Sequence, residues 1–169
     1  TIDPISTTPA TTLESNQANA QLGFSVSSAG DVNGDGYSDV IAGAGSFDAG
    51  ETDEGAAFVF HGSSTGVSIT AAAILEGNQI NARMGFSVST AGDVNGDGFS
   101  DIIVGANLYD DTESNEGAAF VFHGSAAGIN PVAAAMVQSN QAAAQMGYSV
   151  ACAGDVNGDG YSDVIVGAW

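Results

Sequence analysis

The sequence predicts an all-β protein built from repeated four-stranded antiparallel sheets, and two observations carry this prediction. The first is a constant step of 62 residues, since Gly-Phe-Ser-Val begins at position 23, again at 85, and as Gly-Tyr-Ser-Val at 147. The second is that apolar residues form short β-branched, aromatic and small-residue runs between clusters of Gly, Asn, Asp and Ser, as strands do. Apolar residues do not recur at helical spacing over a long stretch.

Each repeat unit is expected to contain four strands. In the first unit these cover residues 24–29, 39–44, 57–61 and 72–76. The alanine runs at 71–73 and 142–144 are too short to hold a helix by themselves. Four-stranded antiparallel units in tandem are typical of the blades of a β-propeller, whose radial packing leaves only short edges exposed.

The repeat also predicts how the chain is divided. We expect residues 1–22 to supply the last strand of a preceding blade, at 10–14, residues 23–84 and 85–146 to form two blades, and residues 147–169 to begin a third. Eleven strands do not close a propeller, so further blades or another copy of the chain are expected to complete it. Since the chain starts at Thr1 without an initiator Met, we expect a processed product or a fragment.

Composition excludes several classes of partner. The 169 residues include 20 acidic and one basic side chain, Arg83, which gives a formal net charge of −19. Such a chain is repelled by phosphate backbones and anionic lipid surfaces, so nucleic acid is not expected as a partner. No apolar run approaches the roughly 18 residues of a membrane-spanning helix, so membrane insertion is not expected either. The large negative charge does favour the binding of cations.

Each repeat contains the motif Asp-x-Asn-x-Asp-Gly-x-x-Asp. Side-chain oxygens at positions 1, 3 and 5 of a tight loop converge, position 7 can add its carbonyl, and position 9 adds a carboxylate. Six or more oxygen ligands suit Ca²⁺ better than Mg²⁺, which demands a tighter octahedron. The sequence therefore predicts about three calcium ions per chain, bound by Asp31, Asn33, Asp35, Tyr37, Asp39, Asp93, Asn95, Asp97, Phe99, Asp101, Asp155, Asn157, Asp159, Tyr161 and Asp163.

Two other interpretations of this motif stand beside calcium binding. Asn-Gly and Asp-Gly are ordinary hairpin signals, so the loops could be metal-free turns. Against this, three carboxylates within about 4 Å repel by roughly 4 kcal/mol per pair at an effective dielectric constant of 20. Three calcium ions would add six positive charges and change the formal net charge from −19 to −13. An EF-hand or dockerin loop is excluded because position 12 holds Ala42, Val104 and Val166 in place of a bidentate acid, and the flanks are strands.

These residues resemble the FG-GAP repeats of integrin α-subunit propellers and their bacterial relatives. Leu22-Gly23-x-Ser25-Val26 stands where the family has Phe-Gly-x-Ser-Val, and Gly43-Ala44-Gly45 stands where it has Gly-Ala-Pro. The resemblance covers essentially the whole chain. It implies a propeller, usually seven-bladed, with calcium between the first and second strands of each blade, and it does not specify a partner.

The expected function is that of a calcium-binding adhesion or recognition module, extracellular or on a cell surface, where calcium is abundant. The sequence offers no nucleophile, base and orienting acid at suitable spacing, so catalysis is not expected. The acidic loops at 46–54 and 108–116, with Phe47 and Tyr109 nearby, could bind a protein or a carbohydrate, or could simply be solvated. Two alternatives remain: a subunit that assembles head-to-tail into a ring or filament by strand pairing between chains, and the accessory propeller of a secreted hydrolase.

Overall fold

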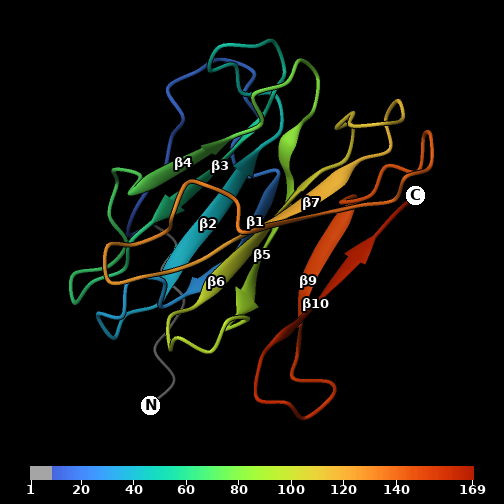
Figure 1. The fold of residues 1–169 in the computed structure, drawn as a ribbon. Coiled ribbons are helices and arrows are strands. Elements are labelled where there is room, and N and C mark those ends of the chain that lie inside the picture. The colour runs from blue at the N-terminus through green and yellow to red at the C-terminus, as the bar shows by residue number, and fades with distance from the viewer. Residues whose placement is uncertain (1–8) are drawn as a thin grey trace.

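A computed structural model describes residues 9–169, which form three antiparallel sheets (Figure 1). These residues contain no helix, so none that could span a membrane. The all-β prediction is therefore confirmed. The ten strands are β1 (Ser25–Gly30), β2 (Asp39–Ala44), β3 (Ala56–Phe60), β4 (Ala73–Glu76), β5 (Met84–Gly92), β6 (Asp101–Ala106), β7 (Ala118–Phe122), β8 (Ala135–Gln138), β9 (Ser149–Gly154) and β10 (Asp163–Gly167).

Each sheet is a simple meander. The strand orders are β1-β2-β3-β4, β5-β6-β7-β8 and β10-β9, and every neighbouring pair is antiparallel. The registers repeat: Ile41 lies opposite Val59 in the first sheet, and Ile103 lies opposite Val121 in the second. Sequential strands that pair with their neighbours are expected of short, turn-bounded segments. The sheets do not close into a ring, so the described residues form part of a propeller.

The strand predicted at residues 10–14 is not formed in the structure, and residues 1–8 of the same predicted element lie outside the described residues. A strand needs a neighbouring strand to share its backbone hydrogen bonds. In the described part of the chain no strand pairs with residues 10–14. The packing of the segment nevertheless follows the repeat. Leu13 packs on the cluster around Phe58 and Phe60, as its equivalent Leu75 packs into the core shared by the first and second sheets.

The hydrophobic core lies between the sheets. Ile41 and Val59 on one side meet Val88, Ile102 and Val104 on the other, all at most 5% exposed. A second layer joins the opposite face of the β5–β8 sheet to β9 and β10. The first strands of successive sheets are neighbours, with β1 beside β5 and β5 beside β9. Abundant Gly and Ala permit this close packing of sheet on sheet.

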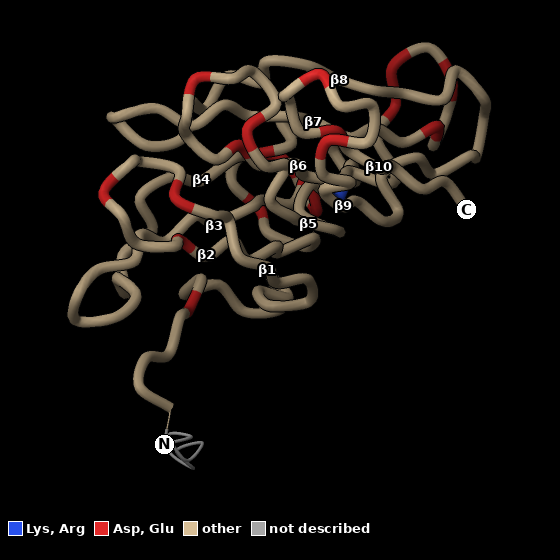
Figure 2. The backbone as a smooth tube through the Cα atoms, turned by 90° about the horizontal axis from the view of Figure 1, so that it is seen from below, with Lys and Arg blue, Asp and Glu red and all other residues tan. Residues whose placement is uncertain are grey.

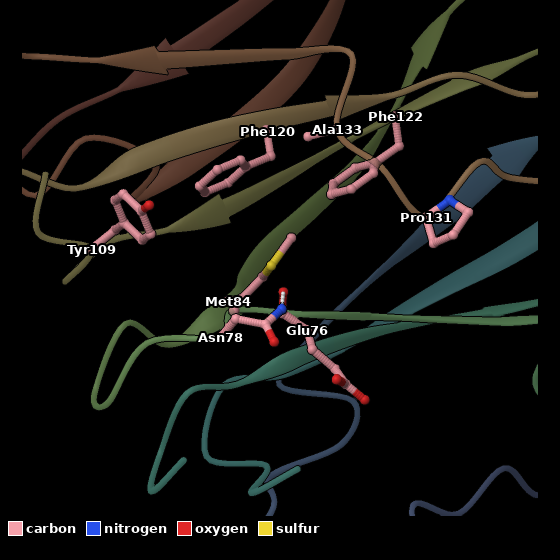
Figure 3. Close-up of a pocket in the computed structure, with 9 residues that line it drawn as sticks. Glu76, Asn78, Met84, Tyr109, Phe120, Phe122, Pro131 and Ala133 are labelled. Carbon is pink, nitrogen blue, oxygen red and sulfur yellow. Dashed lines mark hydrogen bonds between the residues drawn. The ribbon is translucent and has the colours of Figure 1, made fainter. Parts of the chain in front are cut away.

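A cavity of about 220 Å³ lies between the end of β4 and the β5–β8 sheet (Figure 3). The side chains of Met84, Phe120 and Phe122 face it, whereas the Glu76 carboxylate points away. A second cavity, lined by Glu14, Asn16, Phe58 and Phe60 among others, occupies the same place one repeat earlier. Because their lining residues are 62 positions apart, the two cavities are a feature of how each repeat packs.

Candidate metal centres

The three Asp-rich loops join the first and second strands of each sheet, where the sequence predicts them. The motif's Gly residues at the sixth position, Gly36, Gly98 and Gly160, have φ of 88°, 89° and 93°. This left-handed conformation is costly for other residues and explains why Gly is present there. The three loops are thus built alike.

Hydrogen bonds within each loop gather the side chains of positions 1, 3 and 5. The Asp31 carboxylate accepts from the Asp35 N–H at 3.1 Å and from the Gly36 N–H at 2.8 Å. Asn33 Oδ1 also accepts from the Asp35 N–H, and Asp35 Oδ1 accepts from the Tyr37 N–H. The second and third loops repeat these bonds. The backbone therefore turns these oxygens inward along the loop.

The chemistry of this donor set fits a hard cation. Each carboxylate oxygen has two acceptor positions, so one N–H leaves capacity for a further partner. The pKa of Asp155 lies below its ordinary value chiefly because the Gly160 N–H donates to its carboxylate, so this carboxylate is ionised at neutral pH. Among residues 9–169, however, no group of three or more His, Cys, Asp or Glu side chains is arranged to hold a metal ion.

The carboxylate at the ninth position accepts hydrogen bonds from backbone N–H groups and anchors each loop. Asp39 is fully buried and accepts from the Val32 N–H at 2.9 Å and the Gly62 N–H at 2.8 Å, which ties the loop to the end of β3. Asp101 repeats this with Val94 and Gly124, and Asp163 with Val156. Burial raises the pKa of Asp101, against the opposing effect of these N–H groups and of His123. Spacing alone does not reveal this anchoring role.

The seventh position connects neighbouring loops. The Phe99 ring lies against Gly34 of the preceding loop, and the Tyr161 ring lies against Gly96. The residue that follows each ring adds a backbone bond: the Ser100 N–H donates to the Asp31 carbonyl, and the Ser162 N–H donates to the Asp93 carbonyl. The three loops therefore stack along the repeat, a contact that sequence reasoning missed.

Two buried glutamates organise the opposite ends of the sheets. Glu54 Oε1 accepts from the N–H groups of Ala49, Gly50 and Glu51, and Oε2 accepts from the Asn78 N–H at 2.8 Å. Glu116 holds the loop before β7 in the same way through its Oε1. In the sequence both belong to the acidic loops at 46–54 and 108–116. Their recurrence directly before Gly55 and Gly117 was the signal for a structural role.

Replacing Glu54 should therefore weaken the fold in a pH-dependent manner. Burial raises the pKa of Glu54, but four backbone N–H groups outweigh it, and the pKa lies below 4.5. A lowered folded pKa gives stability that is present above about pH 4.5 and lost as the pH falls through the folded value. Glu54→Gln should cost about 1–3 kcal/mol at pH 7, and the difference from wild type should shrink in acid, as denaturant unfolding at several pH values would measure. The exposed neighbour Glu51→Gln is the matched control, and equal losses in both variants would contradict this role.

The loops that contain Phe47 and Tyr109 pack these rings against aromatic side chains of the sheets. Phe47 packs edge-on against Phe58 with ring centroids 5.1 Å apart, and Tyr109 packs edge-on against Phe120 at 5.3 Å. Both rings are half-buried on the core, and binding of a protein or carbohydrate at these loops stays a prediction. The acidic residues themselves lie largely on loops at the ends of the sheets (Figure 2).

Comparison with known protein families decides the identity of these units. The FG-GAP repeat model matches residues 22–60, 84–122 and 146–168, more than half of the chain. The chain belongs to the FG-GAP repeat family. Each matched segment of this FG-GAP chain begins at or just before the first strand of a sheet and contains one Asp-rich loop. The first two segments run to the end of the third strand of their sheets.

Integrin α subunits are among the relatives of this FG-GAP chain. It is 36% identical over 163 residues to integrin alpha-V of Gallus gallus, 35% over 156 residues to integrin alpha pat-2 of Caenorhabditis briggsae, and 33% over 162 residues to integrin alpha-5 of Xenopus laevis. These alignments cover 90%, 82% and 90% of the chain. The chain spans only 12–15% of the length of these relatives.

Proposed function

We propose that this FG-GAP chain is a calcium-stabilised adhesion or recognition module without catalytic activity, placed outside the cell or on its surface. The observation that carries the proposal is the threefold repetition of one oxygen-lined loop, with the same internal hydrogen bonds each time. The integrin α relatives support the assignment to adhesion and to the cell surface. The units 23–84, 85–146 and 147–169 act as successive blades of this module.

Calcium in this proposal serves the fold. The ions would be held by the side chains of Asp31, Asn33 and Asp35 and by the same positions of the other two loops, with Tyr37, Phe99 and Tyr161 adding carbonyls and Asp39, Asp101 and Asp163 adding carboxylates. A divalent ion neutralises carboxylates crowded onto one bend, which otherwise repel one another. Because neighbouring loops are stacked, each filled loop also stabilises the loop next to it.

Native mass spectrometry of the chain tests this stoichiometry. In calcium we expect three bound ions per 16.7 kDa chain, and two when Asp93→Ala and Asp97→Ala remove the ligands of the middle loop. An Asp110→Ala variant, which changes an exposed acid of the β6–β7 loop, should keep three. Ion loss in proportion to removed charge, whichever acids are changed, would show diffuse counterion binding and contradict the proposal.

A further inference from the structure

The three Asp-rich loops share a second chemical feature, an Asn-Gly pair at their third and fourth positions. Each pair lies in the same hexapeptide, Asp-Val-Asn-Gly-Asp-Gly, which begins at positions 31, 93 and 155. Asparagine is a thermally labile side chain. A following glycine promotes its deamidation, because no side chain hinders the backbone nitrogen that attacks the amide. Since the local sequence is identical, a difference in reactivity between the three pairs has to come from the fold.

The asparagine side chain, which is the group attacked, is held in the same way in all three loops. Asn33 Oδ1 accepts from the Asp35 N–H at 3.0 Å, and Asn33 Nδ2 donates to Asp35 Oδ2 at 3.0 Å. The second and third loops repeat both bonds. An N–H that donates to the amide oxygen stabilises the negative charge that the attack places on this oxygen. The amide carbon is therefore equally activated in the three loops.

The glycine nitrogen, which is the attacking group, is held in two of the loops and free in one. The Gly96 N–H donates to Asp93 Oδ1 at 2.7 Å, and the Gly158 N–H donates to Asp155 Oδ1 at 2.7 Å. Among residues 9–169 the Gly34 N–H has no hydrogen-bond acceptor, because the carboxylate at the first position of its loop accepts from the fifth and sixth N–H groups instead. A hydrogen bond to a carboxylate stabilises the protonated N–H and has to break before the nitrogen attacks.

The first and second loops are otherwise alike around the pair. In both, the asparagine is half-buried and the glycine is exposed. The φ angles of Gly34 and Gly96 are 72° and 77°, and at both an added Cβ would meet the ring of the next loop at 2.6 Å. Access of water is therefore similar, and the state of the glycine N–H is the difference between the two pairs.

We propose that Asn33 is a site of spontaneous deamidation, and that it is modified ahead of Asn95 and Asn157 in the folded chain. The Gly34 nitrogen loses its proton to hydroxide and attacks Asn33 Cγ. The new N–Cγ bond closes a succinimide ring while the Cγ–Nδ2 bond breaks and ammonia leaves. Water then opens the ring at either of its two carbonyls, which leaves an aspartyl or an isoaspartyl residue at position 33.

The modification changes the first loop and leaves the other two as they are. Both products carry a carboxylate in place of the amide, so they lose the bond from Asn33 Nδ2 to Asp35 Oδ2 and add a negative charge beside Asp31 and Asp35. The isoaspartyl product also lengthens the backbone between positions 33 and 34 by a methylene carbon. The modified fraction of the first loop therefore increases with the age of the folded chain.

Peptide mapping by mass spectrometry tests the proposal, because it follows all three pairs in one sample during incubation at mildly alkaline pH. We expect Asn33 to be converted about tenfold faster than Asn95 or Asn157 in the folded chain. In concentrated urea the three identical hexapeptides should be converted at the same rate. Methylation by an isoaspartyl methyltransferase identifies the isoaspartyl product. Since the three loops carry the same side chains, the order of the rates is expected both in calcium and in chelator, so it does not depend on calcium binding.

A matched pair of variants tests the cause of the difference. Asp93→Ala frees the Gly96 N–H and should raise the rate at Asn95 toward the rate at Asn33. Asp31→Ala removes the same side chain from the first loop, where the glycine N–H is already free, and should change the rate at Asn33 much less. Circular dichroism shows whether each variant is folded.

The proposal is overturned if the three pairs are converted at equal rates in the folded wild type, or if Asn95 or Asn157 is converted first. It is also overturned if Asn33 leads by the same factor in urea, or if a folded Asp93→Ala variant leaves the rate at Asn95 unchanged. The wild-type comparison needs no variant, so it decides the matter even where a variant does not fold.

Discussion

Gly43→Ala should lower the free energy of unfolding by about 3 kcal/mol or more, because the methyl group has no space. A Cβ at Gly43 would lie 1.9 Å from the Gly85 carbonyl oxygen, a backbone atom that cannot move alone. The same approach recurs one repeat later, where a Cβ at Gly105 would lie 2.1 Å from the Gly147 carbonyl. Urea unfolding of the variant measures the loss.

The control for this substitution is Gly50→Ala in the β2–β3 loop. A Cβ there meets no atom within 4 Å, so the change should stay within about 0.5 kcal/mol or stabilise slightly by restricting the unfolded chain. If Gly43→Ala is as mild as Gly50→Ala, the sheets do not approach as closely as the structure shows. That result would contradict the close packing of each sheet on the next.

Removing calcium should produce a comparably large effect. An ion that binds only the folded chain stabilises it by about 2.7 kcal/mol when its concentration is 100 times the dissociation constant. Three such sites, before any coupling between the stacked loops is counted, would add up to about 8 kcal/mol, which for a domain of this size is on the order of 15–30 °C in melting temperature. Thermal unfolding in excess calcium and in chelator measures the difference.

Two controls separate site binding from general charge screening. Magnesium at the same concentration should shift the melting temperature less, since it demands a tighter octahedron than these loops offer. A variant with Asp31, Asp93 and Asp155 changed to Asn should lose most of the calcium response. A melting temperature that is the same in chelator and in calcium would refute stabilisation by the ion.

The sequence predicted the fold closely because the repeat itself identifies the sheets. The predicted strands at 39–44 and 57–61 correspond to β2 and β3, the latter displaced by one residue. The strand at 10–14 failed for a physical reason: its residues have strand composition and strand-like packing, but backbone pairing depends on a partner elsewhere in space. The sequence indicates which residues suit a strand and pack like one, but it does not show whether a pairing partner is present.

The candidate sites were predictable in position but not in detail. The spacing locates all three loops, and their glycines have the left-handed φ that a tight bend needs. Spacing does not show that the Asp39 carboxylate faces two backbone N–H groups, or that Glu54 is buried while its neighbour Glu51 is exposed. These properties depend on contacts between segments far apart in the chain.

The most direct test of the central claim is a crystal structure of the chain grown in millimolar calcium, with anomalous difference maps calculated at the three loops. We predict one ion in each loop, contacted by the side chains of its first, third and fifth positions, beginning with Asp31, Asn33 and Asp35. Three ordered loops that keep only their internal hydrogen bonds and show no ion density would contradict it.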